Sequence, residues 1–101
     1  MGYYIQTDGR HGKADYLVKK YGAVKLDRAP REWTDIPLDK ALIAVVDNGP
    51  FEAAGVAVDE RDFSDFTTPD HRPITYLLMD YELAVQLANV PIKFRSPRHN
   101  Q

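Results

Sequence analysis

The sequence contains no cysteine and no long apolar run. Without cysteine, disulfide bonds, thiolate zinc sites and cysteine nucleophiles are all excluded. A chain without disulfides suits a reducing compartment, so we expect a cytoplasmic protein. The longest purely aliphatic run covers only residues 41–46, whereas a membrane-spanning helix needs about 20 apolar residues. We therefore expect no membrane partner.

The sequence also lacks a large excess of either charge. Its formal net charge is −2, although 28% of its residues are charged. A strongly basic protein that binds nucleic acid through many phosphate contacts is excluded, so nucleic acid is not an expected partner. The hydrophobic share of 44% is typical of a folded protein. We expect one domain over residues 1–94, followed by a flexible basic tail at 95–101.

The first part of the chain predicts a strand, a helix and a second short strand. Residues 3–6 are rich in tyrosine and favour a strand. Apolar residues then recur with helical spacing, at Ala14, Leu17, Val18 and Tyr21. Gly22 is a typical helix stop, and residues 23–26 follow as a strand candidate.

A long polar loop is predicted at residues 27–39, where Trp33 lies between two prolines. Loops of this length are uncommon unless they are functional or contain a short helix. The apolar runs 41–46 and 51–58 then predict a hairpin at the centre of the sheet, with a turn signal from Asp47 to Gly49. Pro50 lacks the N–H group that a two-residue turn would use, so we expect a wider connection.

The last part of the chain predicts two helices around one strand. Asp59 is a candidate N-cap for a short helix, residues 74–79 favour a strand, and Asp80 is a candidate N-cap for a helix over residues 81–89. The whole pattern indicates an α+β fold: a single small domain with a mixed β-sheet of about five strands and about three helices packed on it.

The first candidate site is the segment between the first strand and the first helix. It combines two glycines with three potentially cationic side chains, at Gly9, Arg10, His11, Gly12 and Lys13. Backbone N–H groups at a helix start, beside such side chains, suit an anion such as a phosphorylated ligand. The spacing differs from a nucleotide-binding P-loop, and Ala14 replaces its hydroxyl residue. The alternative is a tight turn with solvated cations.

The second candidate site depends on strand direction. Asp8, Asp47 and Asp80 each follow a predicted strand, and parallel neighbours would gather the three carboxylates at one sheet edge. They could then hold Mg²⁺ or position a phosphate. The stronger alternative is that Asp80 caps a helix and that Asp8 and Asp47 are turn residues. The three histidines show no zinc-binding spacing, and we expect neither a metal nor a cofactor.

A third group of residues suggests a partner surface. We expect a solvated helix face where three acidic residues gather, at Asp59, Asp62 and Asp65. The alternative is that these residues form a surface that binds a partner. We expect Trp33 to cover part of the core as a lid. The alternative is that Trp33 is an aromatic anchor at an interface with a partner.

Two segments carry a resemblance, HGKADYLVKKYGA at residues 11–23 and VVDNGPFEAAGVAVDE at residues 45–60. Together they resemble small uncharacterised accessory proteins of bacteriophages. The resemblance implies an accessory protein that acts by binding, for example on a host defence or regulatory component in the host cytoplasm. It assigns no role to any single residue.

These observations favour a non-enzymatic binding or accessory protein, such as an inhibitor. Its partner would be a host protein, another host macromolecule or a small phosphorylated ligand. One alternative is a small enzyme that acts on a phosphorylated substrate through the loop at residues 8–13 and the strand-end aspartates. A second alternative is a structural or assembly protein that works as a homo-oligomer.

Overall fold

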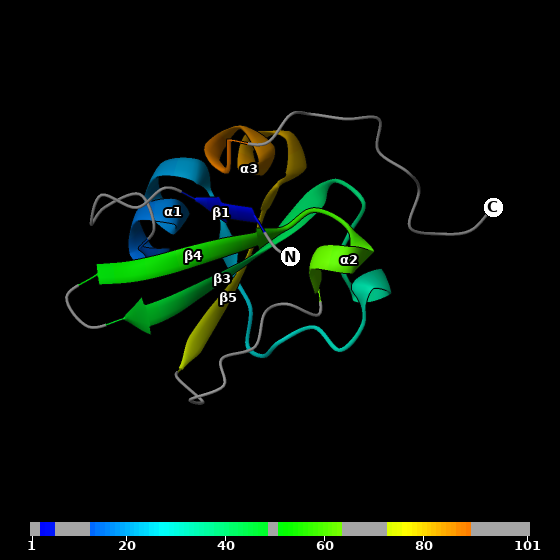
Figure 1. Ribbon diagram of the computed structural model, residues 1–101, viewed down its shortest axis with the longest axis horizontal. Coiled ribbons are helices and arrows are strands. Elements are labelled where there is room, and N and C mark those ends of the chain that lie inside the picture. Colours follow the sequence, from blue (N-terminus) through cyan, green and yellow to red (C-terminus); the bar gives the residue numbers. More distant parts are fainter. Residues whose placement is uncertain (1–2, 6–12, 49–50, 64–72, 90–101) are drawn as a thin grey trace.

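The computed structural model describes residues 3–5, 13–48, 51–63 and 73–89. Along the chain, the elements are β1 (Tyr3–Ile5), α1 (Ala14–Tyr21), β2 (Val24–Lys25), the 3₁₀ helix η1 (Trp33–Asp35), β3 (Lys40–Asn48), β4 (Phe51–Ala57), α2 (Glu60–Phe63), β5 (Ile74–Asp80) and α3 (Tyr81–Leu87) (Figure 1). The α+β class and the predicted order of strands and helices are therefore confirmed. No helix in the described ranges is long and apolar enough to cross a membrane.

The five strands form one sheet in the order β1-β4-β3-β5-β2, and each neighbouring pair is antiparallel. This corrects the expectation of a mixed sheet. Helices between strands suggested parallel neighbours, but β3 lies between β4 and β5, the two strands that the α2 segment connects. β4 and β5 run in the same direction, but β3 lies between them and is antiparallel to both.

The central hairpin is confirmed. β3 extends beyond its predicted run at both ends, whereas β4 ends at Ala57, one residue before its predicted run does. β3 and β4 pair from Leu42 with Ala57 to Asn48 with Phe51. Asp47 and Asn48 therefore belong to the strand and not to the turn. Gly49 and Pro50, on which the expected width of the connection depends, lie outside the described residues.

One face of the sheet packs against α1 and α3, which lie together at the top of Figure 1. Side chains alternate between the faces of a strand, so every second residue of β3 points to these helices. The buried cluster on this face comprises Ile5, Leu17, Ala23, Ala41, Ile43, Val45, Ala54, Val56, Leu77, Met79, Ala84 and Ala88. This cluster is the main core of the domain.

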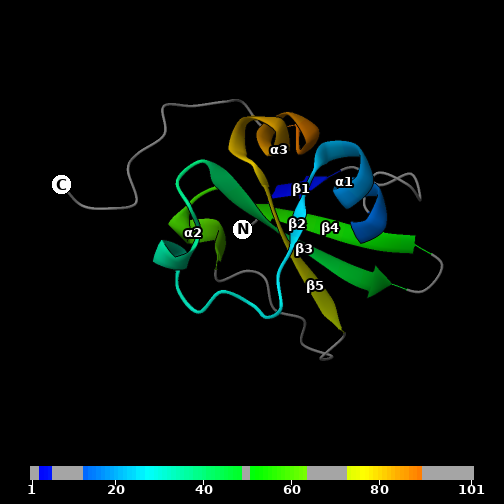
Figure 2. The ribbon, with the colours of Figure 1, turned by 180° about the vertical axis from the view of Figure 1, so that it is seen from behind.

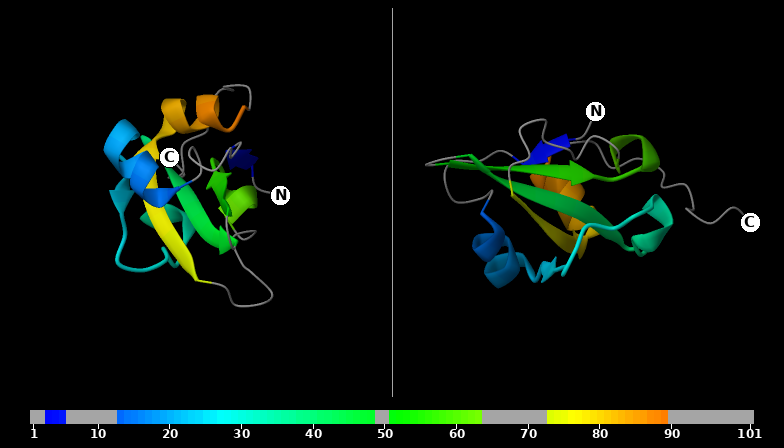
Figure 3. Two further views of the ribbon diagram at one scale, coloured as in Figure 1. Left: turned by 90° about the vertical axis from the view of Figure 1, so that its left-hand side faces the viewer. Right: turned by 90° about the horizontal axis from the view of Figure 1, so that it is seen from below.

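The opposite face carries a smaller buried cluster of Ile36, Leu42 and Ala57. The segment around η1 and the short helix α2 supply the residues that cover it, and Figure 3 shows both segments from two further sides. Burying both faces of β3 explains why residues 41–46 read as a continuous apolar run.

Local sequence signals end and begin the helices as predicted. Gly22 adopts φ +72° after α1, a left-handed conformation that glycine takes without a steric penalty. Asp80 Oδ2 accepts a hydrogen bond from the Leu83 N–H at 3.1 Å and caps α3. Asp59 Oδ1 accepts hydrogen bonds from the N–H groups of Arg61 and Asp62 at the start of α2. These three predictions are confirmed. The expected tail at 95–101 lies outside the described residues.

Candidate functional site

The predicted anion loop falls almost wholly outside the described residues. Asp8, Gly9, Arg10, His11 and Gly12 belong to that part of the chain, and only Lys13 is described. Lys13 is exposed and occupies the N-cap position of α1, where its side chain makes no capping hydrogen bond. The anion loop therefore stays a prediction.

The structure does not bring the strand-end aspartates together. Asp80 pairs with Lys40 at one end of β3, whereas Asp47 pairs with Glu52 near the other end. At about 3.4 Å per residue, the two carboxyl-bearing positions lie more than about 20 Å apart. This corrects the expectation of a shared site, and the antiparallel sheet is the reason. Within the described ranges, no group of three or more acidic or histidine side chains is placed to hold a metal ion.

The acidic segment at α2 is less exposed than its composition suggested. Asp62 is only 4% exposed, and its Oδ2 accepts a hydrogen bond from the Val58 N–H at 3.4 Å. Burial, together with the negative charge of Asp59, raises the pKa of Asp62. Asp62 thus faces inward, which corrects its expected place on a solvated or partner-binding surface. Asp65 lies outside the described residues.

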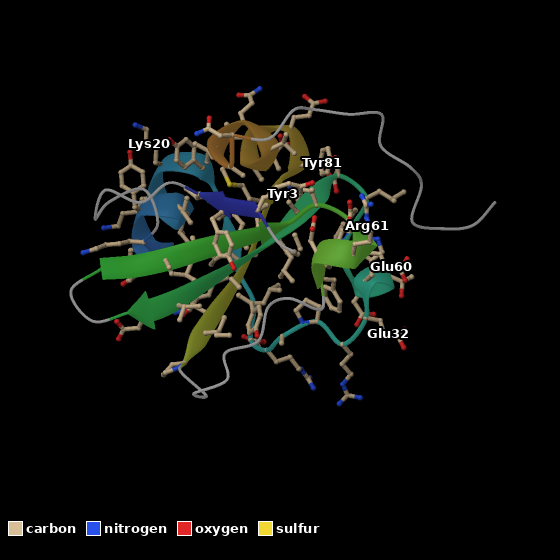
Figure 4. All side chains as sticks on the ribbon, in the orientation of Figure 1. Tyr3, Lys20, Glu32, Glu60, Arg61 and Tyr81 are labelled. Carbon is tan, nitrogen blue, oxygen red and sulfur yellow. The ribbon has the colours of Figure 1, made fainter. Side chains whose placement is uncertain are left out.

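Asp59 is the partly exposed member of this segment. Its Oδ2 accepts a hydrogen bond from the Arg61 guanidinium at 3.0 Å, and the two groups form an ion pair. Figure 4 shows Arg61 on α2. Burial raises the pKa of Asp59, but the hydrogen bonds and charge of Arg61 outweigh burial, so the net pKa is lowered. Asp59 therefore acts as a structural cap, and its charge is already matched by a neighbour.

Trp33 lies over the smaller core cluster. Its ring meets the ring of Phe63 edge to face, with 6.1 Å between centroids, and packs against the cluster formed by Ile36, Leu42 and Ala57. This arrangement supports the interpretation of Trp33 as a lid on the core. It also ties the 27–39 segment to α2, because the two aromatic residues come from these two elements.

A pocket that sequence reasoning missed lies beside this lid. It has a volume of about 320 Å³, near the lower end of the range for ligand pockets. It is formed where the segment after β2 passes beside β5. We call it the arginine pocket, and its lining residues are Leu26, Arg28, Ala29, Pro30, Arg31, Asp35 and Leu78.

Asp35 and Ile36 hold the loop around the arginine pocket. Asp35 Oδ2 accepts hydrogen bonds from the N–H groups of Arg31 and Glu32, both at 3.1 Å. The next residue, Ile36, is 2% exposed and belongs to the smaller core cluster. The Leu26 N–H donates to the Tyr76 carbonyl at 2.8 Å and fixes the other end of the loop to β5. The pocket is therefore anchored at both ends.

The chemistry of the arginine pocket combines apolar contact with positive charge. Leu26, Leu78 and Pro30 are half-buried and supply the apolar lining, whereas Arg28 and Arg31 are exposed. Within the described part of the chain, neither guanidinium group has a hydrogen bond or ion pair. Asp35 contributes one opposing charge to the lining. Guanidinium groups match carboxylate and phosphate oxygens, so this lining suits a ligand with apolar and acidic parts.

The length of the 27–39 loop was the one sequence signal that pointed here. The length of this loop indicates a functional segment, but within the loop the tryptophan is the residue whose type suggests an interface. The arginine pair could not be distinguished from ordinary surface charges, because Leu78 comes from a strand more than forty positions away. Compared with family models, with curated proteins and with solved structures, the chain matches none of them significantly.

Proposed function

We propose that the protein is a non-enzymatic binding protein that takes up its partner at the arginine pocket. The observation that carries this proposal is the pair of guanidinium groups that find no hydrogen-bond or ion-pair partner among the described residues, beside an apolar lining. A ligand with acidic and apolar groups would contact both parts of the pocket. This function agrees with what the resemblance to phage accessory proteins implies.

The rival enzymatic function loses its main geometric support. It depended on the loop at residues 8–13, which lies almost wholly outside the described residues, and on strand-end carboxylates that act together. Of these carboxylates, Asp47 and Asp80 lie at opposite ends of β3. Asp80 also caps α3 through its Oδ2. A binding function makes no such demand, because it needs only complementary charge and shape at one surface.

The test uses citrate, a small tricarboxylate, at constant ionic strength. At a citrate concentration about ten times its Kd, the melting temperature of the wild type should rise by about 5–10 °C. The double variant Arg28→Ala/Arg31→Ala should show no such rise. The control Lys19→Ala/Lys20→Ala removes the same net charge from α1 and should keep the wild-type response.

Two results would overturn the proposal. In the first, the arginine variant and the lysine control respond to citrate equally, which would mean that the stabilisation is a general charge effect. In the second, ¹⁵N NMR spectra show citrate-induced shifts that avoid residues 26–31. Native mass spectrometry of the purified protein with its captured partners would then identify where and what the protein binds.

A further inference from the structure

Among the described strands, β2 forms the edge of the sheet next to the arginine pocket. It is the last strand in the sheet order, and β5 is its one partner in the described ranges. Figure 2 shows it running on into the segment that leads to η1. Val24 is 55% exposed, and Lys25 is exposed as well. A free sheet edge with exposed apolar surface is the feature to which extended peptides add.

The hydrogen bonds of β2 determine which backbone groups point outward. The Leu26 N–H donates to Tyr76, its partner position on β5, and Val24 pairs with Leu78 two residues earlier. Neighbouring residues of an antiparallel strand direct their N–H and C=O groups to opposite sides. The N–H and C=O groups of Lys25 are therefore directed to the open edge.

The arginine pocket lies on the face that a peptide at this edge would reach. Leu26 and Leu78 line the pocket, and Val24 shares their face because side chains alternate along a strand. A peptide strand beside β2 would likewise direct every second side chain to this face. An aliphatic side chain would contact Leu26 at the β2 side of the pocket, and acidic neighbours on the same face would lie toward Arg28 and Arg31.

We propose that β2 and the arginine pocket together bind an extended acidic peptide segment of a partner protein by strand addition. The peptide carries one aliphatic residue in the pocket, flanked by Asp or Glu at alternating positions. This inference rests on the proposed function, since it names the partner of the same site. It adds backbone pairing at Lys25, which a small anion would not use.

Charge argues for a peptide over two other occupants. Nucleic acid is disfavoured by the net charge of −2 and by the small number of arginines at the pocket. A second copy that paired its β2 with this β2 about Lys25 would set two lysines opposite each other and bring two arginine pockets to one face. Like charges directly opposite on neighbouring strands are destabilising. An acidic peptide has neither problem.

The experiment begins with selection from a display library of random peptides of about ten residues, long enough for one strand. The expected result is enrichment of sequences with one aliphatic residue and acidic residues two positions away on either side. An enriched peptide is then synthesised, and its Kd is measured for the wild type and four variants by titration calorimetry.

The variants separate the backbone contribution from the charge contribution. Lys25→Pro removes the outward N–H and is tolerated at a strand edge, so the Kd should rise about tenfold. Lys25→Ala removes the same charge but keeps the N–H, and its Kd should change by less than about twofold. Arg28→Ala and Arg31→Ala should each raise the Kd about tenfold. Circular dichroism of each variant checks that the fold is kept.

The outcomes distinguish this inference from the proposed function. Enrichment of basic or neutral peptides, or no enrichment, overturns the peptide inference, as does an equal effect of Lys25→Pro and Lys25→Ala. In each case, a citrate response that depends on Arg28 and Arg31 would still support the anion-binding function. Slower hydrogen exchange at the Lys25 amide on peptide binding supports strand addition, and unchanged exchange contradicts it.

Discussion

Asp59 Oδ1 accepts a hydrogen bond from the backbone N–H of Asp62 at 3.3 Å, and yet the pKa values of these two carboxyl groups shift in opposite directions. The reason is their surroundings. Asp62 is buried and lies near another negative charge, which disfavours its ionised form. Asp59 is partly exposed, and Arg61 stabilises its ionised form. One turn of chain thus contains two groups with opposite pH dependence.

This difference predicts the effect of Asp62→Asn on stability. A raised pKa in the folded state stabilises the protein below the unfolded value of about 4, and this contribution is lost as the pH rises through the folded pKa. Asparagine is neutral and keeps an acceptor for the Val58 N–H. Asp62→Asn should therefore raise the free energy of unfolding at pH 7 relative to the wild type, and the gain should shrink toward pH 4. Urea denaturation at several pH values measures it.

Asp59→Asn is the control for that experiment. Its lowered pKa gives stability that is present above the unfolded value and lost as the pH falls through the folded pKa. The Asn variant should consequently be less stable than the wild type at pH 7, with a difference that shrinks in acid. A pH dependence of the same sign for both variants would contradict the assigned surroundings.

Trp33 is predicted to contribute mainly to stability. Trp33→Ala removes the edge-to-face contact with Phe63 and uncovers the smaller core cluster. Because the side chain is half-buried, the loss should be about 2–3 kcal/mol. Trp33→Phe keeps an aromatic ring and should lose about 1 kcal/mol. Chemical denaturation gives both values, and a Trp33→Ala protein as stable as the wild type would instead indicate a role in partner binding.

Val45→Asp tests the position of the central hairpin. Val45 is 4% exposed and faces the helices, so an aspartate there would be buried without a partner. The free-energy cost of burying this charge should offset most of a total stability of about 5–10 kcal/mol. Circular dichroism should therefore show a largely unfolded variant. The same substitution at Val24, which is 55% exposed, should leave the fold intact. If the Val45→Asp protein is well folded, the assigned pairing of β3 with β4, which buries Val45, is wrong.

The two anion-binding predictions can be compared directly. Arg10→Ala/Lys13→Ala alters the loop that the sequence indicated, and Arg28→Ala/Arg31→Ala alters the arginine pocket. Both variants lose the same charge. If the arginine pocket is the main site, only its variant should lose the citrate-induced rise in melting temperature, about 5–10 °C at about ten times the Kd. Loss in the Arg10/Lys13 variant alone would assign the site to the loop.

The sequence by itself determined the local structure of this protein. The spacing of Leu17 and Tyr21 specifies α1, Gly22 ends it, and Asp59 and Asp80 cap the helices that follow. These signals are readable because each depends on residues within one or two turns of chain. The central hairpin was equally accessible, since its two apolar runs are close in sequence.

Only the tertiary structure decided how these elements are assembled and what they expose. The placement of β3 between β4 and β5 made the sheet antiparallel and separated Asp47 from Asp80. The packing of α2 buried Asp62, although its acidic neighbours suggested a solvated surface. The arginine pocket exists because Leu78 of β5 lies beside the loop after β2. Each of these outcomes depends on contacts between distant segments, and local periodicity carries no information about such contacts.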